Sequence, residues 1–257
     1  MNQKIIQNCR TLLKAYKEGK LGQTKMPEDS NPSFEDNETE LRLAYFSLPM
    51  ALNYQRNSYT LWESALKTYQ DEETKEVFDI RKVSEMDFDK LKSLLLKHKL
   101  ALQPNKHTTT WQTIAKTIDL NYGSFTQLFD KADKDYLKLK EIIQIKDKKG
   151  FPYLSGPKIF NYWSFIIREY GKIDLKNSKF IEIAPDTHIT QCSVILGVIN
   201  KEESEKLTKD KISEKWRSLL DGTEINPIDM HPPLWFWSRN GFLFKLNNVL
   251  NKEENEG

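Results

Sequence analysis

Apolar residues recur at helical spacing along most of the chain, and strand-like alternation is scarce. The segment 38–55 shows the pattern, with apolar side chains at Leu41, Ala44, Tyr45, Leu48, Ala51 and Leu52. This spacing predicts a helix with one buried face, which Pro49 bends or divides. No repeat of fixed period stands out. The pattern therefore predicts a mostly α protein, built as two helical lobes.

The same spacing predicts several further helices, separated by polar or turn-rich segments. They are expected over residues 1–20, around 62–69, and over 85–102, 107–125 and 133–150. Further helices are expected after the turn near Gly156 up to about residue 170, over 187–200 and over 201–220. A loop is expected at 22–37 and a mixed stretch before residue 184. The segment 226–246 is compact and aromatic, and "NKEENEG" at 251–257 is expected to be disordered. Residues 1–250 thus form one predicted unit of two helical subdomains.

Composition argues against a membrane protein and a disulfide-rich secreted protein, but it does not indicate a particular function. The 257 residues are 38% hydrophobic and 30% charged, and no apolar run reaches the roughly 20 residues that a membrane span needs. The N-terminal segment lacks the apolar centre of a signal peptide. Cys9 and Cys192 are too few and too distant for a disulfide framework, which favours a reducing, cytoplasmic setting. A net charge of +2 neither requires nor excludes nucleic acid.

One motif is "GFPYLSGPKIFNYW", residues 150–163, where Lys158 opens an aromatic helix after a Gly- and Pro-containing turn. Residues 134–170 therefore predict a helix, a short hairpin and a second helix. Backbone N–H groups at Ser155 and Gly156, the helix N-terminus and the nearby Lys149 suit a phosphate. Ordinary turns and lysine-rich helix ends have the same composition, so a purely structural role stays open.

A second motif is "IAPDTHITQCSVILGVI", residues 183–199, in which Asp186 precedes an apolar helical pattern. The simplest interpretation is an N-cap, because an aspartate there accepts hydrogen bonds from the first free amides. A capping aspartate is held rigidly, so capping is compatible with catalysis.

Together the two motifs resemble the helix-hairpin-helix DNA glycosylase superfamily. Its members carry a hairpin ending in Gly-X-Lys, followed by an aspartate in a Val-Asp-Thr-His-like motif; here these are "SGPK" and "PDTH". The hairpin has Tyr153 and Leu154 where the usual Leu-Pro-Gly-Val-Gly pattern has Pro and Gly. The separation of Lys158 from Asp186 is longer than in the endonuclease III-like branch and is typical of the archaeal 8-oxoguanine DNA glycosylase branch.

Two outer segments also resemble that branch. "LPMALNYQRNSYTLWESALKTY" is similar to its early segment, in which an aromatic-Gln pair precedes a Trp-containing helix, and "DMHPPLWFWSRNGF" is similar to its closing segment. The resemblance covers most of the chain in order, and residues 150–200 carry most of it.

The resemblance implies that Lys158 and Asp186 are catalytic and face a cleft between the lobes. An amine nucleophile at C1′ leaves a Schiff base that permits β-elimination. The amine must be unprotonated, which needs a pKa about 3 units below its usual ~10.4. Burial among Phe151, Ile159, Tyr162 and Trp163, and the helix N-terminus, are expected to supply this shift. Asp186 would stabilise positive charge on the sugar.

The base pocket implied by the resemblance consists of an amide and aromatic rings. Gln55 is the amide, Tyr162 shares a helix face with Lys158, Trp235 or Trp237 closes the other side, and Asp229 accepts hydrogen bonds from the base. Core packing is the competing interpretation of each aromatic residue. His188 is expected to be structural.

The implied function is base-excision repair: a DNA glycosylase with AP lyase activity that removes an oxidised purine, 8-oxoguanine above all. The implied partner is damaged double-stranded DNA, bound by a cytoplasmic or nucleoid-associated monomer that has no membrane partner. Four histidines without metal-ligand spacing predict no catalytic metal, and no cofactor is expected, although a main-chain cation site at the hairpin stays open. The alternatives are a glycosylase for another lesion, a non-catalytic helical DNA-binding module, and an interaction scaffold without nucleic acid.

Overall fold

The structure, a computed structural model, describes residues 2–22 and 25–246. It is mostly helical, and the described ranges contain no strand, only an isolated parallel β-bridge between Asp135 and Lys176. The predicted α class is therefore confirmed. The segment 251–257, predicted to be disordered, lies outside the described residues.

The chain divides into two compact units. Both ends of the chain, Met1–Lys25 and Lys179–Gly257, form one unit, here called the terminal unit. The continuous segment Met26–Ser178 forms the other, here called the central unit. Each unit has its own core.

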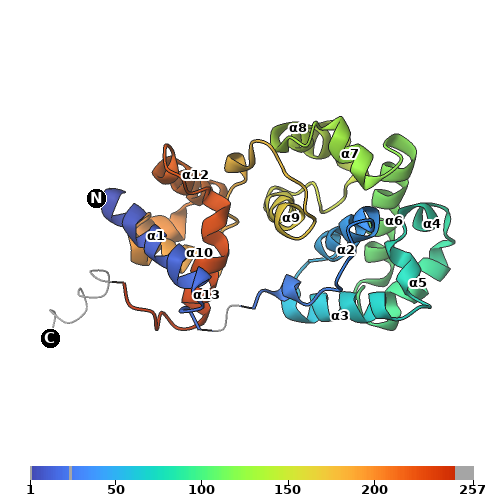
Figure 1. Cartoon of the computed structure of the whole chain (residues 1–257), viewed down its shortest axis with the longest axis horizontal. Coiled ribbons are helices and arrows are strands. Elements are labelled where there is room, and N and C mark those ends of the chain that lie inside the picture. The colour runs from blue at the N-terminus through green and yellow to red at the C-terminus, as the bar shows by residue number, and fades with distance from the viewer. Residues whose placement is uncertain (1, 23–24, 247–257) are drawn as a thin grey trace. The chain divides into compact units, whose positions relative to one another are not determined.

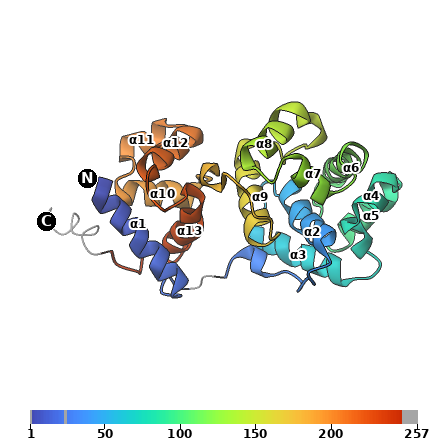
Figure 2. The ribbon, with the colours of Figure 1, turned by 45° about the horizontal axis from the view of Figure 1, so that its top comes forward.

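The central unit is organised around a buried helix, α2 (Thr39–Ala51). Every residue of α2 from Arg42 to Ala51 is buried, as expected for a helix that is covered on all sides. Pro49 lies in its last turn, so the proline neither bends nor divides a longer helix. In Figures 1 and 2, α3 (Ser58–Gln70), α7 (Phe125–Lys131) and α9 (Pro157–Glu169) lie around α2, and each packs against it.

The remaining helices of the central unit are η1 (Pro27–Asp29), η2 (Lys75–Phe78), α4 (Ile80–Glu85), α5 (Phe88–Lys97), α6 (Pro104–Asn121), α8 (Tyr136–Glu141), a π-helical turn η3 (Ile142–Lys146) and η4 (Lys148–Gly150).

Aromatic side chains fill the core between these helices. Trp163 of α9 is fully buried, stacks on Phe129 of α7 with centroids 5.8 Å apart, and donates its indole N–H to Ser47 of α2 at 2.9 Å. Trp111 of α6 donates to the carbonyl of Val77 at 2.8 Å. Buried indole N–H groups are therefore satisfied, so these tryptophans fix the helix packing.

The terminal unit is a smaller helical cluster. Its elements are α1 (Asn2–Lys17), α10 (Thr187–Leu196), α11 (Lys201–Lys206), α12 (Lys209–Leu220), η6 (Pro227–Met230) and α13 (His231–Arg239); η5 (Ser178–Phe180) lies at its boundary. Helix α13 packs against both α10 and α1. Buried Trp216 donates to Ser193 at 2.8 Å, and Tyr16 stacks on Phe236 with centroids 5.9 Å apart. The core of this unit is thus built from both ends of the chain.

Several predicted helices have different boundaries in the structure, and the segment predicted as a helix over 133–150 is α8, the π-helical turn η3 and η4. Two of the differences have a clear local cause. The helix expected to reach Asn200 ends at Leu196, because Gly197 adopts the left-handed conformation (φ 79°) that terminates helices. The charged segment 201–220 is two helices, because Leu207 is extended and Thr208 caps a new start by accepting from the amide of Lys211.

Candidate functional site

The turn that precedes α9 is anchored in the core of the central unit. Phe151 and Leu154 are fully buried, and the amide of Ser155 donates to the carbonyl of Phe151 at 2.9 Å. The amide of Gly156 likewise donates to the carbonyl of Tyr153 at 2.9 Å. Tyr153 has φ of 62°, the left-handed region that a non-glycine residue rarely adopts.

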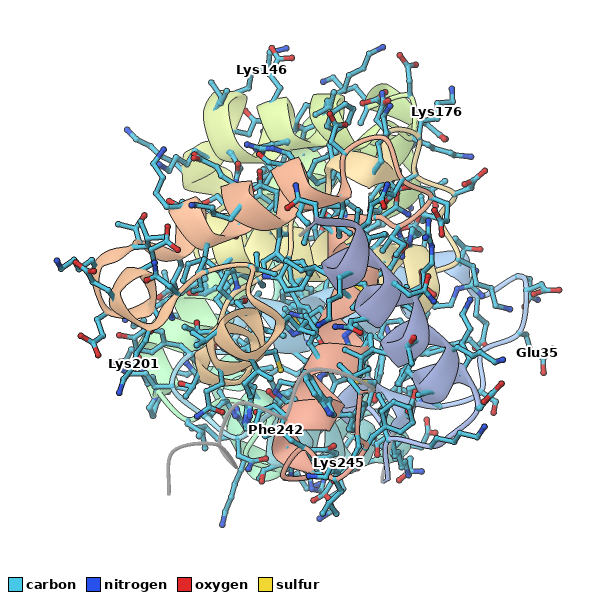
Figure 3. All side chains as sticks on the ribbon, turned by 90° about the vertical axis from the view of Figure 1, so that its left-hand side faces the viewer. Glu35, Lys146, Lys176, Lys201, Phe242 and Lys245 are labelled. Atoms are coloured by element: carbon cyan, nitrogen blue, oxygen red, sulfur yellow. The ribbon has the colours of Figure 1, made fainter. Side chains whose placement is uncertain are left out.

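These hydrogen bonds correct one prediction from the sequence. Ser155 and Gly156 were expected to turn their N–H groups outward toward a phosphate, but both amides are engaged inside the turn, and Ser155 is buried. Of the nearby lysines, Lys149 is exposed. Lys146 projects from the surface in Figure 3 and pairs with Glu141 at 3.0 Å. A phosphate contact in this region therefore depends on lysine side chains.

Lys158 is the second residue of α9 and follows Pro157, whose ring suits the first position of a helix. Its side chain is exposed. Phe151 and Trp163, which were expected to surround the amine, are fully buried in the core. These two rings point into the core, whereas the side chain of Lys158 is exposed, so the expected packing of both rings around the amine is not seen.

Tyr162 lies one helical turn after Lys158, on the same face of α9. Its hydroxyl donates to Oε1 of Glu28 at 2.6 Å, and its ring stacks on Phe165 with centroids 5.8 Å apart. Glu28 is 1% exposed, and among the described residues its Oε2 has no hydrogen-bond partner. Burial raises the pKa of Glu28 to about 7, while the bond from Tyr162 acts in the opposite direction.

Gln55 is exposed in the loop between α2 and α3 and has φ of 49°. Its neighbour Tyr54 contacts Tyr153 in the turn before α9, with ring centroids 5.6 Å apart. Nζ of Lys106, in the first turn of α6, lies 5.0 Å from the centroid of each ring. The structure thus brings the loop of Gln55 to the turn that leads to Lys158.

Asp186 belongs to the terminal unit, where it caps α10. Its Oδ1 accepts from the amide of Ile189 at 2.9 Å, which confirms the predicted N-cap. Among the described residues, none donates a hydrogen bond to its second oxygen, Oδ2. The side chain is partly exposed. The carboxylate is therefore held by one oxygen, which leaves the other able to interact with a ligand.

His188 and Trp235 lie near this cap in the same unit. Nδ1 of His188 is 2.9 Å from Oγ of Ser238, which itself donates to Oε1 of Gln191 at 3.0 Å. Since that hydroxyl proton is committed to Gln191, Nδ1 of His188 is the donor. The ring of Trp235 packs edge-on against His188 at 5.8 Å, with Arg239 over its face at 4.7 Å.

The other two residues proposed for the base pocket differ in exposure. Asp229 is partly buried in η6 and accepts from Nδ2 of Asn226 at 2.8 Å. Trp237 is 1% exposed and donates to the carbonyl of Phe244 at 2.8 Å, so it belongs to the core. Of the two tryptophans considered, only Trp235 has a partly exposed ring.

The site residues predicted from the sequence thus divide between the units. The central unit holds Gln55, Lys149, Ser155, Gly156, Lys158 and Tyr162, and the terminal unit holds Asp186, Asp229 and Trp235. Glu28, Tyr54, Lys106 and Tyr153 are contacts that sequence reasoning missed. The Tyr54-Gln55 pair was the only local signal for any of them.

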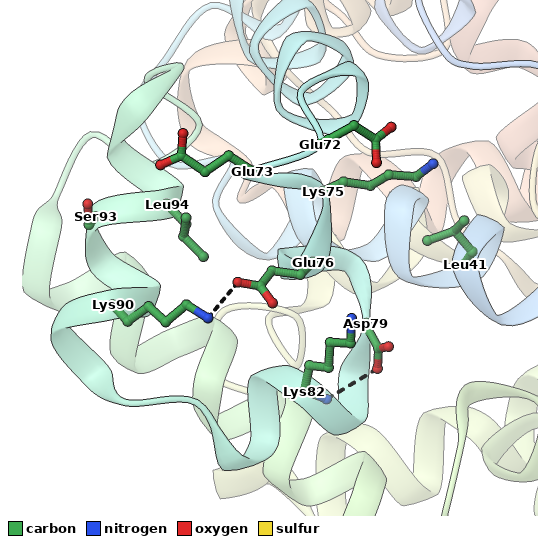
Figure 4. Close-up of a pocket in the computed structure, with 10 residues that line it drawn as sticks. All are labelled: Leu41, Glu72, Glu73, Lys75, Glu76, Asp79, Lys82, Lys90, Ser93 and Leu94. Carbon is green, nitrogen blue, oxygen red and sulfur yellow. Dashed lines mark hydrogen bonds and ion pairs between the residues drawn. The ribbon is translucent and has the colours of Figure 1, made fainter.

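A hollow of about 730 Å³ lies elsewhere in the central unit, beside η2, α4 and α5 (Figure 4). Glu76 and Lys90 point toward each other across it and pair at 2.7 Å. None of the site residues predicted from the sequence lines it. Its lining includes four acidic residues (Glu72, Glu73, Glu76 and Asp79) and three basic residues (Lys75, Lys82 and Lys90), so opposite charges nearly balance.

No protein-family model and no curated protein matches this sequence. Among the described residues, no helix is long and apolar enough to cross a membrane. Within the same ranges, no group of three or more histidine, cysteine, aspartate or glutamate side chains could hold a metal ion.

Proposed function

We propose that this protein is a DNA glycosylase with AP lyase activity that acts on an oxidised purine, 8-oxoguanine above all. The observation that carries the proposal is the local setting of two residues. Lys158 stands exposed in the first turn of α9 behind a tight turn, and Asp186 caps α10 with one carboxylate oxygen. These are the settings that the Gly-X-Lys and Asp-Thr-His motifs of helix-hairpin-helix glycosylases imply.

In the proposed reaction, Lys158 is the nucleophile. Its unprotonated amine attacks C1′ of the damaged nucleotide, and the bond from C1′ to the base breaks, with the base taking the electron pair and a proton. The attached amine then loses a proton and the C1′–O4′ bond breaks, with O4′ taking the electron pair and a proton, which opens the sugar and leaves a protonated Schiff base. This makes the C2′ proton acidic, and its loss expels the 3′ phosphate. Asp186 stabilises the positive charge that develops on the sugar.

The exposed position of Lys158 gives bound DNA a second role in the proposal. Attack on C1′ requires a neutral amine. On the proposal, bound DNA covers the lysine and removes its water, which favours the neutral amine. Gln55, Tyr162, Asp229 and Trp235 remain the proposed contacts to the extruded base.

The test is borohydride trapping with a duplex that carries one 8-oxoguanine. Borohydride reduces the Schiff base to a stable amine, so the wild-type protein should form a covalent adduct visible on a denaturing gel. Lys158→Ala and Lys158→Gln should form none. Lys116→Ala is the matched control, because Lys116 is an exposed lysine on α6 of the same unit and should be dispensable.

Two outcomes contradict the proposal. An adduct that persists in Lys158→Ala removes this lysine as the nucleophile. Failure of the wild type to form an adduct with either 8-oxoguanine or an abasic-site duplex removes the lyase reaction. Measuring free-base release from duplexes with other lesions then shows whether a monofunctional glycosylase acts on a different base.

A second candidate is a DNA-binding module without chemistry. The exposed Lys158 favours it, because a solvated lysine suits a phosphate as well as it suits a reaction. Such a protein would bind undamaged duplex with a steep salt dependence and leave every lesion intact. Binding with no adduct and no base release would decide for this candidate.

A further inference from the structure

Three segments of the central unit meet at the rings of Tyr54 and Tyr153. The rings lie 5.6 Å apart at 52°, and Nζ of Lys106 is 5.0 Å from each ring centroid. Arg56 links two of these segments by donating to the carbonyls of Leu100 at 2.7 Å and Lys99 at 3.1 Å. Tyr54, Lys106 and Tyr153 are here called the tyrosine–lysine cluster.

The cluster is open to solvent. Tyr54 is 40% exposed, although large apolar side chains in this protein are mostly buried. Tyr153 is partly exposed, and both it and Gln55, next to Tyr54, have positive φ. A left-handed backbone at a non-glycine residue costs about 1 kcal/mol or more and persists where the surroundings hold it. Two strained positions beside an exposed ring pair indicate a surface that is shaped for contact.

The three segments that carry the cluster have charged side chains of one sign. Segments 52–57, 99–107 and 148–158 contain no aspartate or glutamate, although acidic and basic residues nearly balance in the whole chain, at 37 and 39. Their basic residues are Arg56, Lys99, Lys106, Lys148, Lys149 and Lys158. The positive potential acts on buried His107, whose pKa falls to about 4 through burial first and then through the charges of Arg56 and Lys106.

A tilted, exposed pair of tyrosine rings with one ammonium group close to both suits a ligand that is both aromatic and anionic. A nucleotide has both properties, because its base stacks on an aromatic ring and its phosphate binds ammonium groups. An acidic peptide would use the charge but leave the rings without a partner. A cationic ligand would be repelled by Lys106.

We propose that the tyrosine–lysine cluster binds an unpaired nucleotide of a DNA strand, with the base stacked on Tyr54 and the phosphate on Lys106. The site rests on the proposed function for its choice of DNA, and it deepens that function by giving the protein a preference for strands with unpaired bases. A glycosylase that extrudes a base creates such a nucleotide in the opposite strand. Blunt duplex offers no free base face and should engage only the lysines.

The test is binding, measured by the fluorescence anisotropy of a short labelled single strand and of the blunt duplex of the same sequence. Tyr54→Ala should weaken binding of the single strand about fivefold or more, as loss of one stacked base predicts, and should leave the duplex nearly unchanged. Tyr153→Gly should act in the same direction while relieving the left-handed backbone. Lys106→Gln should weaken both and flatten the salt dependence.

Phe180→Ala is the matched control. Phe180 is 39% exposed, carries Lys179 over its ring at 5.2 Å, and lies outside the three segments. It should leave single-strand binding unchanged. Equal weakening by Phe180→Ala, or none by Tyr54→Ala, overturns the proposal. Tyr54→Trp and Tyr54→Leu distinguish loss of stacking from loss of the fold. The tryptophan variant keeps an aromatic ring and should keep the preference for the single strand, whereas the leucine variant should lose it.

These outcomes are separate from those of the trapping experiment. Binding requires no reaction, so an absent Schiff base together with intact single-strand binding removes the lyase function and leaves this site standing. An adduct that forms normally in Tyr54→Ala, with unchanged single-strand affinity, removes the site and leaves the lyase function standing.

Discussion

At the scale of single residues, Glu28 is a buried carboxylate whose hydrogen-bonding capacity is only partly used. Its neighbour Asp29 accepts from Tyr170 at 2.8 Å and from the amide of Met26 at 2.7 Å, so both of its oxygens are satisfied. Glu28 has only Tyr162 on Oε1, and its buried Oε2 has no partner among the described residues. An ionised carboxylate in that setting opposes folding. Nothing local in "MPEDS" predicts this, because η1 packs against α3 and the hydrogen bond to Glu28 comes from Tyr162 of α9, both distant along the chain.

The raised pKa of Glu28 predicts how stability depends on pH. Its pKa is about 7 in the folded protein and 4.5 for an unperturbed glutamate. Between these values the folded state holds a proton that the unfolded chain has lost. The free energy of unfolding should therefore fall as pH rises from 4.5 to about 7, by roughly 3 kcal/mol from this group alone.

The measurement is urea denaturation across that pH range. Glu28→Gln should remove most of the slope, because an amide does not titrate and can still accept from Tyr162. Glu63→Gln, at an exposed position of α3, should keep the wild-type slope. A Glu28→Gln protein whose stability falls as steeply as the wild type would refute the assignment.

At the scale of elements, apolar periodicity predicted the long helices well and the short ones poorly. Helices α2, α3 and α9 were predicted because each carries a sustained apolar pattern. Helix α7 was missed, although Ser124 caps it locally by accepting from the amide of Gln127 at 3.1 Å. Its seven residues are too few for a sustained apolar pattern, and part of the stabilisation of its start comes from Glu40 of α2, which accepts from the amides of Phe125 at 2.9 Å and Thr126 at 2.7 Å.

Two substitutions of Asp186 distinguish its role as the N-cap of α10 from its proposed role in the reaction. Asp186→Ala removes the acceptor for the amide of Ile189 and should destabilise the terminal unit by about 1 kcal/mol. Asp186→Asn keeps an acceptor and should be nearly as stable as the wild type. On the proposed function, both variants should form the trapped adduct far more slowly. An Asp186→Asn protein with full trapping activity would reduce this residue to a cap.

The turn before α9 packs against α6, and the two segments approach each other closely at Gly150. A Cβ atom at this position would lie 2.5 Å from Cγ2 and 2.6 Å from Oγ1 of Thr117. Gly150→Ala should therefore destabilise the protein by about 1–3 kcal/mol, as overpacking does. Thr117→Ala should restore part of that loss in the double variant, because it removes the two closest atoms. Additive effects of the two substitutions in denaturation would show that the clash does not form.

At the scale of the whole molecule, the residues proposed for catalysis and base binding belong to two units, each with its own core. Sequence motifs paired Lys158 with Asp186 because their order along the chain follows a family pattern. Periodicity could not show that the terminal unit combines both ends of the chain, since that association depends on contacts such as that of Tyr16 with Phe236.

The division of the chain predicts what the central unit can do alone. Residues 26–178 are continuous and contain buried α2 with its surrounding helices, so this fragment should fold cooperatively. It carries the whole tyrosine–lysine cluster but lacks Asp186. Circular dichroism and thermal denaturation should show a helical fragment with one transition, which binds the labelled single strand with nearly full affinity and forms little trapped adduct with 8-oxoguanine. A folded fragment that traps as fast as the whole protein would remove Asp186 from the reaction, because every group required would then lie within the central unit.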